Sequence, residues 1–133
     1  MFLLDTHVLV WLVEGSDRLG PRAARLADAA LTDGELAVAS ISFWEIAMLA
    51  TRRRIVLDVP PLQWRLHVLG LGVQEVPLSG DVAMEAAALG NLHQDPADRI
   101  IVATGLSAGA ILATADNRIL GWRGSLRCHD ARR

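Results

Sequence analysis

The chain has 133 residues, of which 52% are hydrophobic, with a formal net charge of −2 and one cysteine, Cys128. No apolar run approaches the roughly 18 residues of a membrane-spanning helix, and a lone cysteine excludes an internal disulfide. The near-neutral charge gives no overall attraction for nucleic acid. A chain of this length suits one domain with one core. We expect a single domain over residues 1–133, in the cytoplasm, with some apolar surface covered by a partner.

Short runs rich in apolar residues alternate with longer segments of helical periodicity. Typical start signals precede the helices, namely proline at positions 21, 60 and 96, threonine at position 6 and serine at position 79. This alternation predicts a mostly parallel sheet with right-handed crossovers and helices on both faces. The expected fold is a three-layer α/β/α arrangement with five strands, at residues 2–4, 36–39, 73–76, 110–113 and 126–128, and seven helices, at residues 7–13, 21–31, 43–53, 60–69, 81–89, 97–107 and 116–120.

Four acids follow predicted strands or open predicted helices: Asp5, Glu45, Asp98 and Asp116. Each has an ordinary explanation as a helix cap, since Ser42 and Glu45 fit a capping box and Asp95 suits an N-cap before Pro96. Serine, threonine or asparagine would cap equally well, however. Because the strand-to-helix turns of a parallel sheet lie on one edge, we expect the four carboxylates to converge there.

Clustered carboxylates repel one another, and a divalent cation would neutralise them. A site made of oxygen ligands without paired histidines or cysteines suits Mg²⁺ or Mn²⁺ rather than zinc. We expect Asp5, Asp98 and Asp116 to hold the metal, with Glu45 acting directly or through water. Thr6 and Thr114 either orient these carboxylates or serve as a helix cap and a strand-end hydroxyl. Such a site indicates phosphoryl chemistry.

All thirteen basic residues are arginine. The absence of lysine excludes a P-loop nucleotide-binding protein, and it argues against response-regulator receivers and haloacid-dehalogenase-like phosphatases, which use a lysine at the phosphoryl site. An acidic site needs basic residues elsewhere to attract RNA. Candidates are the run Arg52, Arg53 and Arg54, which could instead offset a helix dipole, and Arg99, which could instead pair with an acid.

Four blocks of the sequence resemble the signature blocks of the PIN-domain family, and more narrowly the VapC-type ribonuclease toxins of bacterial toxin–antitoxin pairs: Leu3-Leu4-Asp5-Thr6-His7, Ser42-Phe43-Trp44-Glu45-Ile46-Ala47, His93-Gln94-Asp95-Pro96-Ala97-Asp98-Arg99-Ile100-Ile101-Val102-Ala103 and Leu112-Ala113-Thr114-Ala115-Asp116. By position, the four acids match the acidic quartet of that family. The resemblance implies a Mg²⁺- or Mn²⁺-dependent endoribonuclease that cleaves transfer or ribosomal RNA, forms a homodimer and is inhibited by a VapB-type antitoxin. The alternative is a catalytically silent PIN-like module that binds RNA or a protein.

Overall fold

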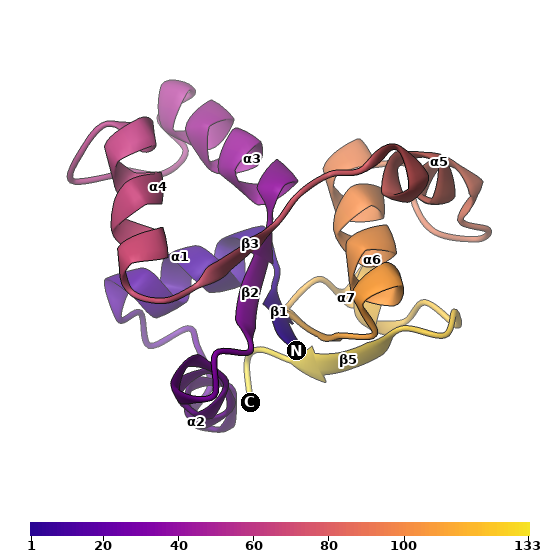
Figure 1. Cartoon of the computed structure of the whole chain (residues 1–133), viewed down its shortest axis with the longest axis horizontal. Helices are drawn as coiled ribbons and strands as arrows, with labels where there is room; N and C mark the ends of the chain where they lie inside the picture. The colour runs from indigo at the N-terminus through magenta and orange to yellow at the C-terminus, as the bar shows by residue number, and fades with distance from the viewer.

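A computed structural model describes residues 1–133 as a five-stranded sheet flanked by helices (Figure 1). Every strand pair is parallel, and the strand order is β3-β2-β1-β4-β5. The expected α/β/α fold is therefore confirmed. The strands are β1 (Phe2–Leu4), β2 (Leu36–Ala39), β3 (Gln74–Val76), β4 (Ile111–Thr114) and β5 (Arg127–Asp130), and the helices are α1 (Thr6–Glu14), α2 (Pro21–Thr32), α3 (Ser40–Thr51), α4 (Pro61–Gly70), α5 (Gly80–Ala88), α6 (Pro96–Ala108) and α7 (Asn117–Leu120).

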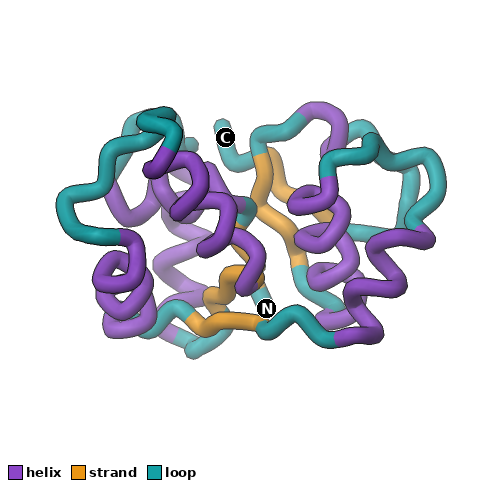
Figure 2. The backbone as a smooth tube through the Cα atoms, turned by 90° about the horizontal axis from the view of Figure 1, so that it is seen from above, coloured by secondary structure: helices purple, strands orange, loops and turns teal.

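The order of the strands places a topological switch point at the centre of the sheet. The chain first moves outward from β1 through β2 to β3, then returns to the other side of β1 to form β4 and β5. Figure 2 shows the strands running between two groups of helices. The crossovers change direction between β1 and β4, and in open parallel sheets ligands bind at the carboxyl edge beside such a point.

Side-chain alternation along the central strand explains the two layers of the core. Phe2 and Leu4 pack with residues of α1, α2, α3 and α4, whereas Leu3 packs with Ile101 and Val102 of α6 and Ile119 of α7. Successive residues of a strand point to opposite faces of a sheet, so three consecutive apolar residues anchor both layers. This burial fixes the position of the residue that follows β1. None of the helices is long and apolar enough to cross a bilayer.

The start of α3 and the cap of α1 differ from the prediction, whereas the other helix starts agree to within one residue. Helix α3 begins at Ser40, directly after β2, whereas the sequence predicted a turn over residues 40–42. The Ser40 hydroxyl donates to Glu75 (2.6 Å) and the Ser42 oxygen accepts from the Thr6 hydroxyl (3.0 Å), so the predicted capping box does not form. Helix α1 is capped by Asp5 rather than by Thr6. The hydroxyl groups of Ser40, Ser42 and Thr6 bond residues that are distant in sequence, so they do not cap the helices beside them.

Candidate functional site

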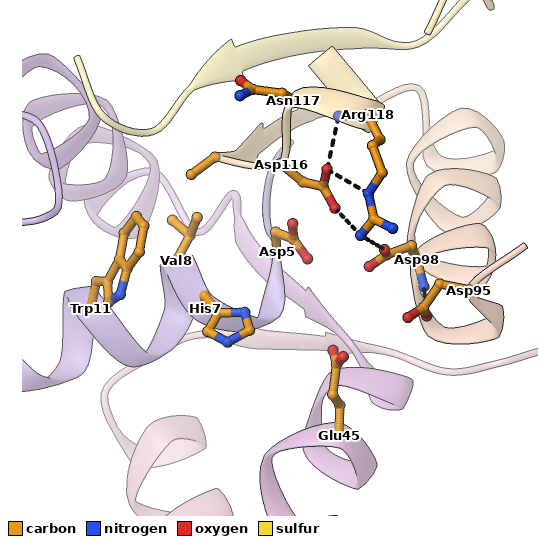
Figure 3. A pocket seen from close by; sticks show the side chains of 11 residues that line it. Asp5, His7, Val8, Trp11, Glu45, Asp95, Asp98, Asp116, Asn117 and Arg118 are labelled. Atoms are coloured by element: carbon orange, nitrogen blue, oxygen red, sulfur yellow. Dashed lines mark hydrogen bonds and ion pairs between the residues drawn. The ribbon is translucent and has the colours of Figure 1, made fainter. Parts of the chain in front are cut away.

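The four predicted acids line one pocket of about 610 Å³ at the carboxyl edge of the sheet. Figure 3 shows their side chains with those of their neighbours. Asp5 follows β1 and Asp116 follows β4, so these two acids flank the switch point, while Glu45 comes from α3 and Asp98 from the first turn of α6. The structure thus brings together the four carboxylates that the sequence singled out. The remaining lining residues are His7, Val8, Trp11, Asp95, Ala115, Asn117 and Arg118.

Asp5 lies at the centre of the site and is held from two sides. Its Oδ1 accepts a hydrogen bond from the main-chain N–H of Thr6 (2.8 Å), and its Oδ2 accepts from the Thr114 hydroxyl (2.5 Å). Only 8% of Asp5 is exposed. Burial raises the pKa of this carboxyl, although the bonds from Thr114 and Thr6 oppose the rise. Asp5 is thus held in a fixed position, and a nearby cation would stabilise its ionised form.

Thr114 connects the ends of the two central strands. Besides donating to Asp5, its hydroxyl oxygen accepts a hydrogen bond from the main-chain N–H of Asp116 (3.1 Å). Thr114 is the last residue of β4 and is fully buried. The hydroxyl of Thr6 is used differently, because it donates to Ser42 and Thr6 reaches Asp5 only through its main-chain nitrogen. Of the two predicted orienting threonines, Thr114 is the one whose hydroxyl bonds Asp5, whereas a hydrogen bond from the Thr6 side chain opposes the rise in the pKa of Glu45.

Asp98 does not cap α6, because the side chain of Asp95 is the N-cap of that helix. The Asp95 side chain accepts from the main-chain N–H of Asp98 (3.2 Å), as the sequence predicted. The Asp98 Oδ2 atom lies 2.7 Å from His93 Nε2, which donates to the ionised carboxylate. Burial is the main cause that raises the pKa of Asp98 to about 6; the negative charge of Asp5 adds to the rise, and the His93 hydrogen bond opposes it.

Asp116 both caps a helix and forms an ion pair. Its Oδ1 accepts from the main-chain N–H of Arg118 (2.8 Å), which makes it the N-cap of α7. The Arg118 guanidinium donates to the same carboxylate through Nε (3.2 Å) and a terminal nitrogen (3.0 Å). Burial alone would raise the pKa of Asp116, but the hydrogen bonds from Arg118 outweigh it and lower the pKa. The cap that the sequence suggested is present, and it does not remove Asp116 from the pocket.

Glu45 reaches the pocket from the other helical layer. It lies in the second turn of α3, beyond the positions that cap a helix, and its side chain points toward Asp5 (Figure 3). Burial raises the pKa of Glu45, and the negative charge of Asp5 raises it further. Because the helix start at Ser40 removes the capping explanation, the position of Glu45 at the pocket is its distinguishing feature.

The donor atoms of this pocket fit a divalent cation. Ligand atoms of His93, Asp98 and Asp116 all lie within 4.8 Å of one another, and Asp5 and Glu45 line the same pocket. The terminal nitrogen of Arg118 lies 3.0 Å from Asp116 and 3.6 Å from Asp98, so the guanidinium supplies positive charge to both carboxylates. A carboxylate-rich set of this kind suits a hard, oxygen-binding ion.

Arg99 does not reach the pocket, and its predicted contact with substrate needs correction. Only 7% of the residue is exposed. Its guanidinium donates to five main-chain carbonyl oxygens that end α5 and form the following loop, those of Ala86, Ala87, Leu89, Leu92 and His93. Arginine has five N–H donors, so no donor remains for RNA. We therefore assign Arg99 a structural role, binding the loop that carries His93 to α6.

The run of three arginines lies just beyond the end of α3, and only one member lines a pocket near the acids. Arg54 borders a second pocket of about 450 Å³, together with Arg18. His7 and Trp11 line both this pocket and the acidic one, so the two are adjacent. Arg52 and Arg53 are exposed and line neither pocket.

Two residues of the site were missed by sequence reasoning. His93 was set aside because His7 and His93 resemble neither a catalytic triad nor a metal-binding pair, yet His93 bonds Asp98. Arg118 was not singled out, although it stands two residues after Asp116, where a side chain returns easily to its own N-cap. The spacing from Asp116 to Arg118 is a local signal that could have found it. The reach of Arg118 to Asp98 depends on tertiary structure and leaves no such signal.

Comparison with known proteins agrees with the fold. A model of the PIN domain matches residues 2–121. The chain is 41% identical over 122 residues to Ribonuclease VapC22 of Mycobacterium tuberculosis, covering 91% of each protein. These matches show that the chain belongs to the PIN-domain family, within its VapC group.

Solved structures of the same architecture include toxin–antitoxin complexes. VapBC2 from Rickettsia felis, bound to a DNA fragment from its promoter, superimposes with a TM-score of 0.69 at 15% identity and covers 96% of both chains. DNA-bound VapBC from Salmonella typhimurium gives a TM-score of 0.68 at 17% identity, covering 97% of this chain and 96% of the other. At such low identity these likenesses establish the fold.

Proposed function

We propose that this chain is a divalent-metal-dependent endoribonuclease and the toxin of a toxin–antitoxin pair. The observation that carries the proposal is the convergence of Asp5, Glu45, Asp98 and Asp116 on one pocket at the switch point of the sheet. The relative that shares 41% identity is named a ribonuclease, which supports RNA as the substrate. Transfer and ribosomal RNA are the substrate classes that we expect, and both place the activity in the cytoplasm.

In this proposal, Asp5, Asp98 and Asp116 hold Mg²⁺ or Mn²⁺, and Glu45 joins them directly or through water. Bound there, the ion would lower the pKa of a water molecule and offset charge that develops on the phosphate. Thr114 keeps Asp5 and Asp116 in a fixed relation because its hydroxyl bonds both. His93 orients the Asp98 carboxylate by donating to one of its oxygens. The chain thereby presents a preorganised set of carboxylates.

RNA needs a positively charged path to reach an acidic pocket, and the adjacent pocket supplies one. Arg18 and Arg54 line it, and Trp11, which borders both pockets, offers an aromatic face to a base. We propose that the RNA segment next to the cleaved phosphodiester bond runs across Trp11 toward Arg54. Glu14, which also lines the second pocket, limits how far the positive surface extends.

Exposed apolar side chains supply surface for protein partners. Trp44 is 58% exposed, and on α4 the side chains of Leu62 and Leu66, one turn apart, are 73% and 59% exposed. Such apolar surface is typical of interaction sites. The neighbours whose titles describe VapBC complexes support a VapB-type antitoxin as the partner. We propose a homodimer that binds this antitoxin, and light scattering of the purified chain alone and with its partner measures both assemblies.

The substitution Asp98→Asn tests the proposed function most simply. It keeps the size of the side chain and removes the negative charge, so we expect RNA cleavage to fall by at least about 100-fold because a metal ligand is lost. Circular dichroism should show an unchanged fold. Asp130→Asn is the matched control, because Asp130 pairs with Arg132 outside the pocket and should leave cleavage unchanged.

The alternative function is a silent module that binds RNA or protein. Under that alternative, the wild-type chain would bind RNA or a protein without cleaving RNA, and Asp98→Asn would leave that binding unchanged. A wild-type chain that cleaves while Asp98→Asn does so at the same rate would instead remove Asp98 from the machinery.

A further inference from the structure

The guanidinium of Arg118 lies between Asp116 and Asp98, two of the proposed metal ligands. It bonds both oxygens of Asp116 and lies 3.6 Å from the Asp98 oxygen that His93 also contacts. Figure 3 shows the side chain extending from α7 across to Asp98. A cation that binds Asp98 and Asp116 must therefore compete with an arginine of the same chain. The side chain of Arg118 is nevertheless 61% exposed, so it has room to move.

We propose that Arg118 is a displaceable counter-cation, which holds Asp98 and Asp116 in the metal-free protein, is displaced by the divalent ion and then binds a phosphate of the RNA. The metal competition rests on the observed ion pairs and on the metal site of the proposed function, whereas the phosphate contact rests on its RNA substrate. The guanidinium fork that matches a carboxylate also matches a phosphate, so the same donors serve both states.

Exposure distinguishes Arg118 from the arginine that the fold cannot release. Arg99 is buried, and all its donors are used by main-chain carbonyls. Arg118 bonds only carboxylates, at the mouth of an open pocket. Exposed ion pairs are weak, whereas a divalent ion binds several carboxylates at once. The exchange of Arg118 for a metal ion is therefore favourable, but it is opposed by the ion pairs that must break.

The chain contains its own matched control for Arg118. Arg132 follows Asp130 at the same spacing, with Nε 2.9 Å from Oδ1 and a terminal nitrogen 2.9 Å from Oδ2. Its main-chain N–H also donates to Asp130 Oδ1 (3.0 Å), as that of Arg118 does to Asp116. The local motif is thus the same, but Asp130 and Arg132 do not line the acidic pocket. Arg132 also donates to the side chain of Asn117 (2.9 Å), which lines the pocket but is not a proposed metal ligand.

The first measurement is calorimetric titration of Mn²⁺ into the metal-free protein without RNA. We expect Arg118→Gln to bind Mn²⁺ at least about threefold more tightly than the wild type, because one competitor is removed. Arg132→Gln should bind with wild-type affinity, and Arg118→Lys, which keeps the charge but loses the fork, should lie between. Wild-type or weaker affinity in Arg118→Gln would overturn the competition.

The second measurement is the salt dependence of binding to a single-stranded RNA, with Ca²⁺ replacing Mg²⁺ to limit cleavage. Losing one phosphate contact reduces the slope of log affinity against log salt concentration by about 0.7. We expect this reduction in Arg118→Gln and not in Arg132→Gln. An equal slope in both variants would overturn the phosphate contact. If the wild type neither binds nor cleaves RNA, the proposed function and the phosphate contact fail together, while the Mn²⁺ titration still decides the competition.

Discussion

Thr114 is the residue on which the geometry of the acidic pocket depends most directly. Its hydroxyl bonds the side chain of Asp5 and the main chain of Asp116, so one oxygen links two proposed metal ligands. Both ligands follow adjacent central strands, and Thr114 lies buried between them. Neighbouring groups that orient metal ligands typically change metal affinity or activity by 10- to 100-fold.

We therefore expect Thr114→Val to lower Mn²⁺ affinity by about tenfold, because the isosteric side chain fills the same space without donating to Asp5. Calorimetric titration measures the change. Thr104→Val is a control of equal burial, since the Thr104 hydroxyl donates only to a carbonyl of its own helix, that of Ile100. If both variants bind Mn²⁺ equally well, Thr114 has no orienting role.

The raised pKa of Asp98 predicts how metal stabilisation depends on pH. In the folded chain this pKa is about 6, against an ordinary value of 3.8. Asp98 contributes stability that is fully present below pH 3.8 and is lost as the pH rises through 6, because the folded state then holds an ionised buried carboxylate. A metal requires the ionised form and relieves this loss. Mg²⁺ should therefore raise the melting temperature more at about pH 7.5 than at about pH 5.

Thermal melts at the two pH values, with and without Mg²⁺, measure this difference. An equal shift at both values would contradict the assignment of Asp98 as a ligand. Asp98→Asn should lose the part of the pH dependence that Asp98 contributes, while Asp5 and Glu45, whose pKa values are also raised, keep theirs.

Among the secondary-structure elements, α6 stabilises part of the site through Arg99. Arg99 lies next to Asp98 on α6 and binds the carbonyls of the segment that leads from α5 to His93. Removing a buried hydrogen-bonded charge leaves those carbonyls without partners. We expect Arg99→Gln to lower the free energy of unfolding by about 3 kcal/mol.

Urea denaturation measures this loss. Arg127→Gln is the control, because the exposed Arg127 donates to a single carbonyl, that of Gly109, and should cost far less. Similar stability losses in the two variants would show that the buried network of Arg99 adds little.

The elements themselves were largely predictable from local patterns. Apolar strands followed by helices, with proline or serine at the starts, indicated every strand and helix, and Ser79 and Asp95 cap α5 and α6 as expected. The start of α3 was not predictable, because Ser40 and Ser42 look like turn residues in sequence. Their hydroxyls find partners on β3 and α1, which only the tertiary structure brings near.

At the scale of the whole molecule, the parallel topology made the convergence of the acids predictable. Once strands alternate with helices, Asp5 and Asp116 must meet at the same edge, and the strand order places them on either side of the switch point. The contacts of His93, Arg99 and Arg118 were not predictable in this way. The direction of a long side chain depends on which carbonyls and carboxylates the completed fold leaves within reach.

A cleavage assay with and without a divalent metal ion decides whether the acidic pocket is a metal-dependent nuclease site. Purified wild-type chain, freed of antitoxin, should cleave transfer or ribosomal RNA when Mg²⁺ or Mn²⁺ is supplied and stop when a chelator removes the ion, because a metal held by Asp5, Asp98 and Asp116 would lower the pKa of the attacking water. Activity should return when the metal is restored in excess. Cleavage that continues at full rate in the chelator, or none in any metal, would contradict the account.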